Sequence, residues 1–142
     1  MFVSDILKIK GTDIVSITSD EPAAAAIALL CERHIGAVLV LDSHERILGI
    51  LSERDLVRAM NTFREEVFAK RVSELMTQRV VTCSPQDPVA AIMGMMTAQR
   101  FRHVPVLEEG RLVGLISIGD VVKSRIEEAQ AEVEALRQYI TT

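Results

Sequence analysis

The pattern of apolar and polar residues in the first half of this chain recurs in the second half. Short apolar runs at 37–41 and 104–107 predict buried strands, and a second apolar run follows each of them. The polar segments between the runs, 42–45 and 108–110, are typical of hairpin turns. The pattern thus predicts two antiparallel strand pairs, one in each half of the chain.

Helical patterns surround these strand pairs. Residues 2–9 predict a short amphipathic helix that stops at Gly11, and 14–17 alternate like a short strand. The next helix is expected to run through Ala23 to about His34, with Asp20 capping the free N–H groups of its first turn and Pro22 at the helix entry, where its missing N–H costs nothing. Gly36 is expected to close it.

A third helix is expected from Asp55 to about 61, and the charged residues 62–71 are expected to form a connector. The second half then repeats the order of the first, with Pro85 and Pro88 before its first long helix. The overall prediction is an α+β fold.

The two halves are copies of one unit. Gly-Ile-Leu-Ser-Glu-Arg-Asp at 49–55 matches Gly-Leu-Ile-Ser-Ile-Gly-Asp at 114–120, and Pro88 lies 66 residues after Pro22. Halves of about 60 residues bury too little surface to be stable alone, so the copies are expected to share a core. The predicted domains are 3–64 and 72–128, with a connector at 65–71 and a helical extension at 129–142.

The C-terminal helix departs from the repeat because it continues far beyond the point that matches residue 61. Its apolar residues follow heptad spacing, and they are Val122, Ile126, Ala129, Val133, Leu136 and Ile140. Two interpretations stay open. The stripe packs on its own domain, or it pairs with a second copy of the chain.

Composition narrows the range of functions. A net charge of −4 over 142 residues argues against binding nucleic acid without sequence preference, which needs a basic face. No apolar run approaches the roughly 20 residues that cross a membrane, and the first residues do not resemble a signal peptide, so we expect a soluble, cytoplasmic protein. Cys31 and Cys83 lie in apolar runs without a nearby second cysteine, which predicts buried, reduced thiols.

The sequence offers little for catalysis. It contains no Gly-rich phosphate loop and no HExxH or GxSxG motif, and His34, His44 and His103 are scattered. We therefore expect no enzyme activity, no catalytic residue, no catalytic cofactor and no metal.

The duplicated serine and aspartate are the best candidates for a binding site. Ser52 with Asp55, and Ser117 with Asp120, each place a hydroxyl and a carboxylate at a helix start. A carboxylate accepts two hydrogen bonds from a ribose diol, and free helix N–H groups suit phosphate. The same spacing is also that of a capping box, which only stabilises a helix. Spacing alone leaves both interpretations open.

Basic residues at 100–103, Arg-Phe-Arg-His, stand just before the strand at 104–107 and favour an anion there. The matching segment of the first half, His-Ile-Gly-Ala at 34–37, keeps a single residue that can be charged, so the two sites should differ. The alternative is a solvated helix end whose dipole favours cations.

The two Gly-x-x-Ser-x-x-Asp segments, the Arg-His-Val-Pro-Val strand at 102–106, the Val-Ser-Glu-Leu-Met segment at 72–76 and the duplication together resemble a tandem pair of CBS domains over about residues 3–126. The resemblance implies two pseudo-symmetric β-α-β-β-α repeats packed through their sheets. It also implies two clefts that bind adenosyl ligands such as AMP, ADP, ATP, NAD(H) or S-adenosylmethionine, and a homodimer.

Carried onto this sequence, the resemblance implies two sets of ligand-binding residues. The Asp120 cleft would use Ile14, Val15, Ser16, Gly36, Ala37, Arg54, Arg102, His103, Ser117 and Asp120. The Asp55 cleft would use Ser52, Asp55, Val80, Val81, Arg102, His103, Val104 and Pro105. Because Gly36 and Ala37 replace a basic pair and Gly119 replaces Arg54, the Asp120 cleft is expected to bind a phosphorylated ligand more tightly.

The function expected from the resemblance is a stand-alone regulator that senses an adenine nucleotide and signals to a separate, unidentified effector protein by a change of conformation. Neither nucleic acid binding nor membrane insertion is expected. The alternative is a structural dimerisation module without a ligand, in which both Ser-x-x-Asp segments act only as helix caps.

Overall fold

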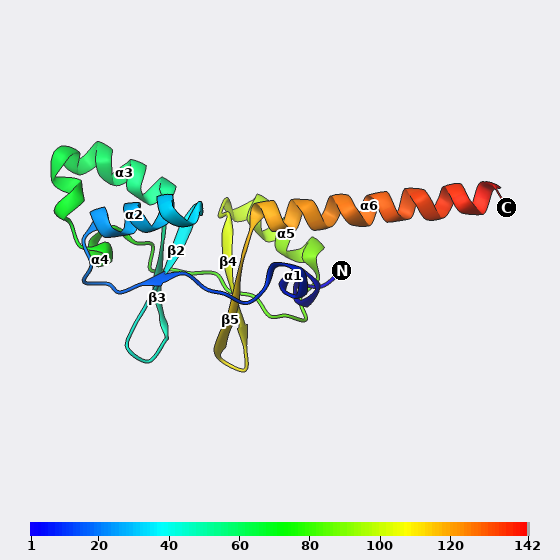
Figure 1. Ribbon diagram of the computed structural model, residues 1–142, viewed down its shortest axis with the longest axis horizontal. Helices are drawn as coiled ribbons and strands as arrows, with labels where there is room; N and C mark the ends of the chain where they lie inside the picture. The colour runs from blue at the N-terminus through cyan, green and yellow to red at the C-terminus, as the bar shows by residue number, and fades with distance from the viewer. Residues whose placement is uncertain (142) are drawn as a thin grey trace. The chain divides into compact units, whose positions relative to one another are not determined.

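The computed structural model describes residues 1–141, which form two compact units (Figure 1). We call residues 14–80 the middle unit. Residues 1–13 together with those from 81 onward are called the terminal unit. The predicted α+β fold is confirmed, since each unit combines helices with a small sheet of its own.

The middle unit is built around a sheet of order β1-β2-β3, in which β1 runs parallel to β2 and β2 antiparallel to β3. Its elements are β1 (Ser16–Ile17), α2 (Ala23–Arg33), β2 (Ala37–Leu41), β3 (Ile47–Ser52), α3 (Glu53–Phe63), the 3-10 helix η1 (Arg64–Ala69) and α4 (Val72–Leu75). Small alanines on α2 and the apolar run of β2 let the helix approach the sheet closely, and Ala23, Ala26, Val38 and Val40 are fully buried.

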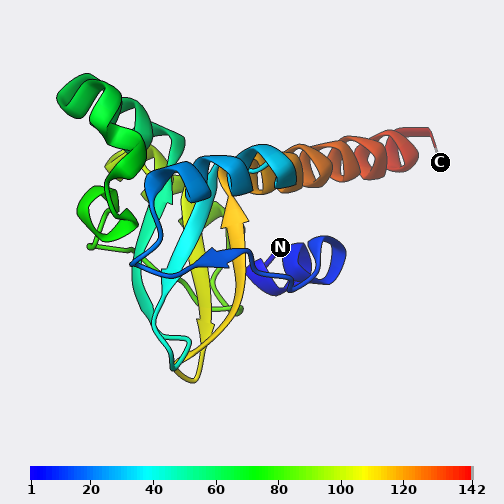
Figure 2. The same cartoon turned by 60° about the vertical axis from the view of Figure 1, so that its left-hand side comes forward.

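The terminal unit has an antiparallel pair of strands, β4 (His103–Glu108) and β5 (Arg111–Ser117). Its helices are α1 (Val3–Lys10), α5 (Val89–Gln99) and α6 (Ile118–Thr141). Figure 2 shows α1 beside the first part of α6, and the two helices are in contact. Val3, Val89, Val104, Ile116 and Val121 are all fully buried in one core.

The short leading helix of each sequence repeat packs with the strands of the other repeat. Helix α1 precedes β1 in the chain but lies in the terminal unit, where it contacts β5, and α4 contacts β3 in the middle unit. In the middle unit, Thr77 after α4 forms a backbone bridge to Ile50, with both N···O distances 2.9 Å. The compact units therefore divide the chain differently from the repeats.

Three sequence-based expectations about helix ends are wrong. Helix α2 starts at Ala23 and Pro22 is its N-cap, with no side-chain cap, because Asp20 lies two residues too early to reach the free N–H groups. At the other end His34, with φ of 53°, takes the left-handed conformation and its N–H donates to the Leu30 carbonyl, so the helix ends before Gly36. Helix α3 begins at Glu53, with Ser52 as its cap.

Two predicted segments differ from the structure. Residues 64–69, expected within a charged connector, form η1, whose Val67 is fully buried in the core of the middle unit. The strand expected at 14–17 shrinks to Ser16–Ile17, and within residues 1–141 its counterpart in the second repeat is only a single bridge between Cys83 and Val106. Residues 64–69 are helical because Val67 packs into the core. The strand at 16–17 is short because few neighbouring backbone groups are placed to pair with it.

Helix α6 leaves its apolar stripe open beyond the first turns. Val121 and Ser124 are buried in the terminal unit, whereas the exposed fraction is 52% for Ile126, 61% for Leu136 and 79% for Ile140. Packing of the stripe on its own domain therefore does not occur in the second half of the helix. No helix within residues 1–141 combines the length and apolar character needed to cross a membrane.

The two cysteines differ in exposure. Cys83 is buried, as predicted, and lies in the core of the terminal unit. Cys31 is exposed on α2, so the prediction of burial is wrong for this residue. The apolar run around Cys31 is helical, and only one face of that helix covers the sheet.

Candidate functional site

Ser117 and Asp120 form a closed polar group where β5 meets α6. The Asp120 Oδ2 atom accepts hydrogen bonds from the Ser117 N–H at 2.8 Å and from the Ser117 hydroxyl at 3.0 Å. In return the Ser117 Oγ accepts from the Asp120 N–H at 3.3 Å. The sequence spacing puts both side chains on one side of the first helical turn, and this arrangement is a capping box.

Lys10 is a third partner of Asp120. Its Nζ lies 2.7 Å from Asp120 Oδ2 and 2.7 Å from the carbonyl oxygen of Leu115. Partial burial alone would raise the pKa of Asp120. The hydrogen bond and charge of Lys10 and the bonds from Ser117 outweigh burial, so the pKa lies below its ordinary value of 3.8. Asp120 is therefore ionised at neutral pH.

The middle unit repeats this group around Asp55, at the start of α3. Asp55 Oδ2 accepts from the N–H and the hydroxyl of Ser52, at 2.9 and 3.0 Å. Its Oδ1 accepts from the Thr77 hydroxyl at 2.9 Å. Asp55 is buried, with 7% of its surface exposed. Both carboxylate oxygens are thus engaged by neighbours within the middle unit.

The strand beside each aspartate carries the other predicted residues. His103 pairs with Ser117 across β4 and β5, and the Arg102 carbonyl accepts from the first N–H of α6 at 2.8 Å. Ala37 pairs with Ser52 in the same register, and Gly36 accepts the N–H of Glu53 at 3.0 Å. The backbone geometry is duplicated, but the first copy lacks the arginine and the histidine.

The structure groups the predicted site residues by unit. The terminal unit brings together Arg102, His103, Ser117 and Asp120, with Val104 and Pro105 buried in β4. The middle unit brings together Gly36, Ala37, Ser52, Arg54 and Asp55. Ile14, Val15 and Ser16 lie at its N-terminal end, in and before β1, while Val80 ends it and Val81 starts the second segment of the terminal unit. Each predicted set draws residues from both units.

Ser16 lines a cavity of about 360 Å³ in the middle unit. Glu21, Asp42 and Glu45 also line this cavity. Three carboxylates repel phosphate, so this cavity does not suit a nucleotide's phosphate group. Residues 1–141 contain no group of three or more His, Cys, Asp or Glu side chains placed to hold a metal ion.

Sequence reasoning missed Lys10 and Thr77. Lys10 is the last residue of α1 and Thr77 lies two residues after α4, and each contacts the aspartate of the other repeat. The similarity between residues 3–7 and 72–76 marked those helices as equivalent. It carried no signal that they pack against the opposite repeat's aspartate, because that contact depends on tertiary structure.

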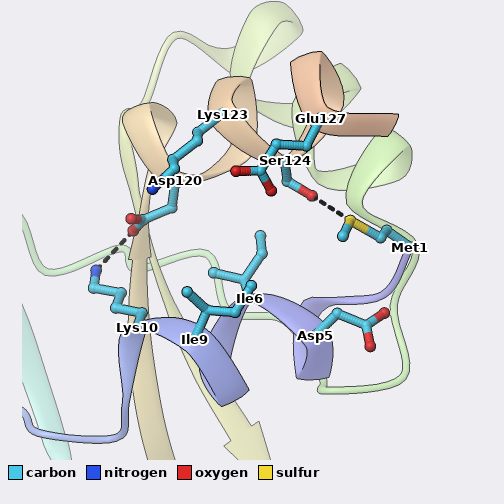
Figure 3. Close-up of a pocket in the computed structure, with 9 residues that line it drawn as sticks. All are labelled: Met1, Asp5, Ile6, Ile9, Lys10, Asp120, Lys123, Ser124 and Glu127. Carbon is cyan, nitrogen blue, oxygen red and sulfur yellow. Dashed lines mark hydrogen bonds and ion pairs between the residues drawn. The ribbon is translucent and has the colours of Figure 1, made fainter. Parts of the chain in front are cut away.

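A cavity of about 260 Å³ opens between α1 and the first turns of α6 (Figure 3). Lys10 and Asp120 lie at one end of it, and Met1 lies at the other. The remaining lining residues mix apolar, acidic and basic side chains, namely Asp5, Ile6, Ile9, Lys123, Ser124 and Glu127. Asp120 therefore borders a cavity within the terminal unit.

Comparison with known proteins finds relatives that contain CBS domains. The CBS domain-containing protein CBSX3, mitochondrial, of Arabidopsis thaliana is 30% identical over 146 residues, covering 97% of this chain and 71% of that protein. The CBS-domain containing protein ATU1752 from Agrobacterium tumefaciens has a solved structure with 46% identity and a TM-score of 0.86, covering 88% of this chain and 99% of that one.

A more distant likeness concerns the fold alone. The CBS domain pair of protein MJ0100, solved in complex with 5′-methylthioadenosine and S-adenosyl-L-methionine, is 24% identical with a TM-score of 0.78 and covers 92% of this chain and 98% of that one. The model of the CBS domain family matches residues 3–62 and 72–127. The duplicated Ser-x-x-Asp groups and the matching folds have one explanation: this chain belongs to the CBS domain family and carries two CBS domains.

Proposed function

We propose that this protein is a regulatory module that binds an adenosine-containing ligand, with Asp120 holding the ribose. The observation that carries the proposal is the ionised Asp120 at the start of α6, beside the strand β4, which begins at His103 directly after Arg102. A carboxylate can accept both hydroxyls of a ribose diol. Cations and the N–H groups of a helix start suit a phosphate. Neighbouring residues of the terminal unit thus supply an acceptor for the ribose and donors for the phosphate.

The ligands of a solved CBS domain pair support an adenosine-containing ligand. MJ0100 was solved with two adenosine-containing molecules. The proposed ligand set for this chain is AMP, ADP, ATP or NAD(H), because the Arg102 guanidinium adds positive charge just before His103, which pairs with Ser117 across the sheet.

The Asp55 site is proposed to bind more weakly. Both oxygens of Asp55 already accept hydrogen bonds, and Thr77, which donates one of them, is held by its backbone bridge to Ile50. Around Asp120, the three bonds from Ser117 and Lys10 all end on Oδ2. A ribose diol therefore displaces fewer fixed contacts at Asp120 than at Asp55.

The proposed activity is signalling rather than turnover. A ligand changes an equilibrium between conformations only by its difference in affinity for them. We propose that the protein acts as a homodimer and passes the change to a separate effector protein. The exposed apolar stripe of α6 supports pairing with a second copy, because large apolar surfaces seldom stay open to water.

Titration calorimetry with AMP tests the ligand site. Asp120→Ala is expected to weaken binding about tenfold to a hundredfold, as for the loss of a charge-assisted hydrogen bond, and Asp55→Ala is expected to weaken it less. Asp87→Ala is the matched control, because Asp87 accepts the Ser84 N–H at 2.8 Å in another Ser-x-x-Asp group outside both predicted sites. A larger loss from Asp55→Ala than from Asp120→Ala contradicts the ranking.

The second candidate function is a structural dimerisation module without a ligand. The specific observation in its favour is that both Ser-x-x-Asp groups have the full geometry of capping boxes. Thermal unfolding with AMP, ATP and NADH separates the two candidates. A ligand at a hundred times its dissociation constant adds about 2.7 kcal/mol of stability, whereas a module without a ligand shows no shift with any of the three.

A further inference from the structure

Lys10 occupies the carboxylate that the proposed function assigns to a ribose. Its Nζ lies 2.7 Å from Asp120 Oδ2 (Figure 3). It also donates to the Leu115 carbonyl oxygen at 2.7 Å and thereby joins α1 to β5 and α6. The ammonium group is a strong donor, and here it takes a lone pair that a ribose hydroxyl would use. In the other copy Thr77, a neutral residue, stands at Asp55.

The backbone under Lys10 is fixed while its side chain has room to move. Val3, Ile6 and Leu7 anchor α1 in the core of the terminal unit, and the Gly11 N–H closes the helix on the Leu7 carbonyl at 2.8 Å. The Lys10 side chain is 38% exposed and borders the cavity between α1 and α6. It can therefore leave Asp120 without unfolding the helix.

We propose that Lys10 is an internal competitor for Asp120, which a bound ribose displaces, and that it thereby makes the site selective for phosphorylated over uncharged adenosine ligands. This inference rests on the proposed function of Asp120. In the free protein the lysine neutralises the carboxylate. In the bound state it needs a new anionic partner.

The proposed selectivity follows from the charge that the ligand itself brings to Lys10. A second cation, Lys123, lines the same cavity, so a displaced Lys10 ammonium meets like charge there. Two carboxylates, Asp5 and Glu127, also line the cavity and outnumber Lys123, so the cavity compensates a displaced Lys10 in part, although Asp5 already accepts the Phe2 N–H at 2.8 Å. A ligand phosphate offers Lys10 a full negative charge in exchange for Asp120, and an uncharged nucleoside offers none.

The test compares adenosine with AMP by titration calorimetry on the full chain. Lys10→Met removes the competitor and keeps the apolar stem. It is expected to raise the affinity for adenosine about twofold to fivefold, the range for a partly exposed ion pair. The affinity for AMP should rise less or fall, so that the AMP-to-adenosine ratio decreases. Lys10→Arg is expected to behave like the wild type, and Lys123→Met is the control for a cation of the same cavity.

Two outcomes overturn the inference. If Asp120→Ala weakens AMP binding while Lys10→Met leaves adenosine affinity unchanged or lower, Lys10 is not a competitor, and the proposed function stands. If neither adenosine nor AMP binds any variant, the proposed function fails and takes this inference with it. Carboxyl NMR titration without ligand gives an independent readout, since Lys10→Met must raise the pKa of Asp120. An unchanged Asp120 pKa also overturns the inference.

Discussion

At the scale of single residues, the two Ser-x-x-Asp groups differ in the side chain that completes each of them. That side chain comes from outside the Ser-x-x-Asp segment. Ser52 and Ser117 hold their aspartates with nearly the same distances. The neutral Thr77 hydroxyl completes the group around the buried Asp55, and a partly exposed cation, Lys10, completes the group around Asp120. Identical local geometry therefore gives sites with different charge and different access.

The cysteines allow a prediction at this scale. Burial, aided by the negative charge of Asp87, raises the pKa of the Cys83 thiol to about 12, so it stays protonated at neutral pH. Only the exposed Cys31 should react with a thiol reagent such as DTNB in the native protein. We expect one fast thiol per chain in buffer, both thiols in guanidinium chloride, and no fast thiol in Cys31→Ser. Two fast thiols in the native wild type would refute the burial of Cys83.

At the scale of elements, the leading helix of one repeat, and the residues directly after the leading helix of the other, pack against a glycine in a strand of the opposite repeat. A Cβ atom at Gly114 would lie 2.6 Å from Leu7 Cδ2, the end of a side chain on α1. A Cβ atom at Gly49 would lie 2.7 Å from both the Thr77 carbonyl oxygen and Met76 Sδ. The glycines of the repeated motif therefore serve close packing between a strand and the segment that begins the opposite repeat.

The two glycines should differ in their tolerance of alanine. Gly49→Ala forces the backbone at Thr77 to move and is expected to lower the free energy of unfolding by about 1–3 kcal/mol. Gly114→Ala meets only a side-chain end and should cost less. Urea denaturation measures both. As controls, Leu7→Val should reduce the cost of Gly114→Ala, and Met76→Ala should leave most of the cost of Gly49→Ala. Equal costs in the single variants would contradict this account.

At the scale of the whole molecule, one chain builds two units with separate cores. The buried residues of each core come only from its own unit, and both cores are mainly aliphatic. Helix α6 continues beyond the core of the terminal unit with its apolar stripe open, which Figure 1 shows as the long C-terminal helix. The proposed homodimer gives this stripe a partner.

Charge placed on the stripe tests the dimer. Val133→Glu with Leu136→Glu puts two carboxylates at exposed stripe positions, and we expect a dimer of the wild type and a monomer of this double variant in sedimentation equilibrium. Gln130→Glu with Ala131→Glu adds the same charge elsewhere on the helix and should leave the dimer intact. The same mass for the wild type and the stripe variant would reject pairing through α6.

Much of the fold could be predicted because its determinants are local. The hairpins follow from apolar runs on either side of polar turns, and the predicted strand at 37–41 coincides with β2. The Ser-x-x-Asp spacing determines the capping geometry at both helix starts. Errors arose where a local signal had a competitor, as when His34 took the left-handed conformation two residues before Gly36.

The sequence by itself determined the doubled unit, the aliphatic cores and the paired hydroxyl and carboxylate, because periodicity and short-range hydrogen bonding suffice for them. Only the tertiary structure decided which side chain stands against each carboxylate. Lys10 and Asp120 are 110 positions apart, and Thr77 and Asp55 are 22 apart. Such partners meet only after the leading helices pack on the opposite repeat's strand, a choice made by buried surface and close approach at glycine rather than by any local pattern.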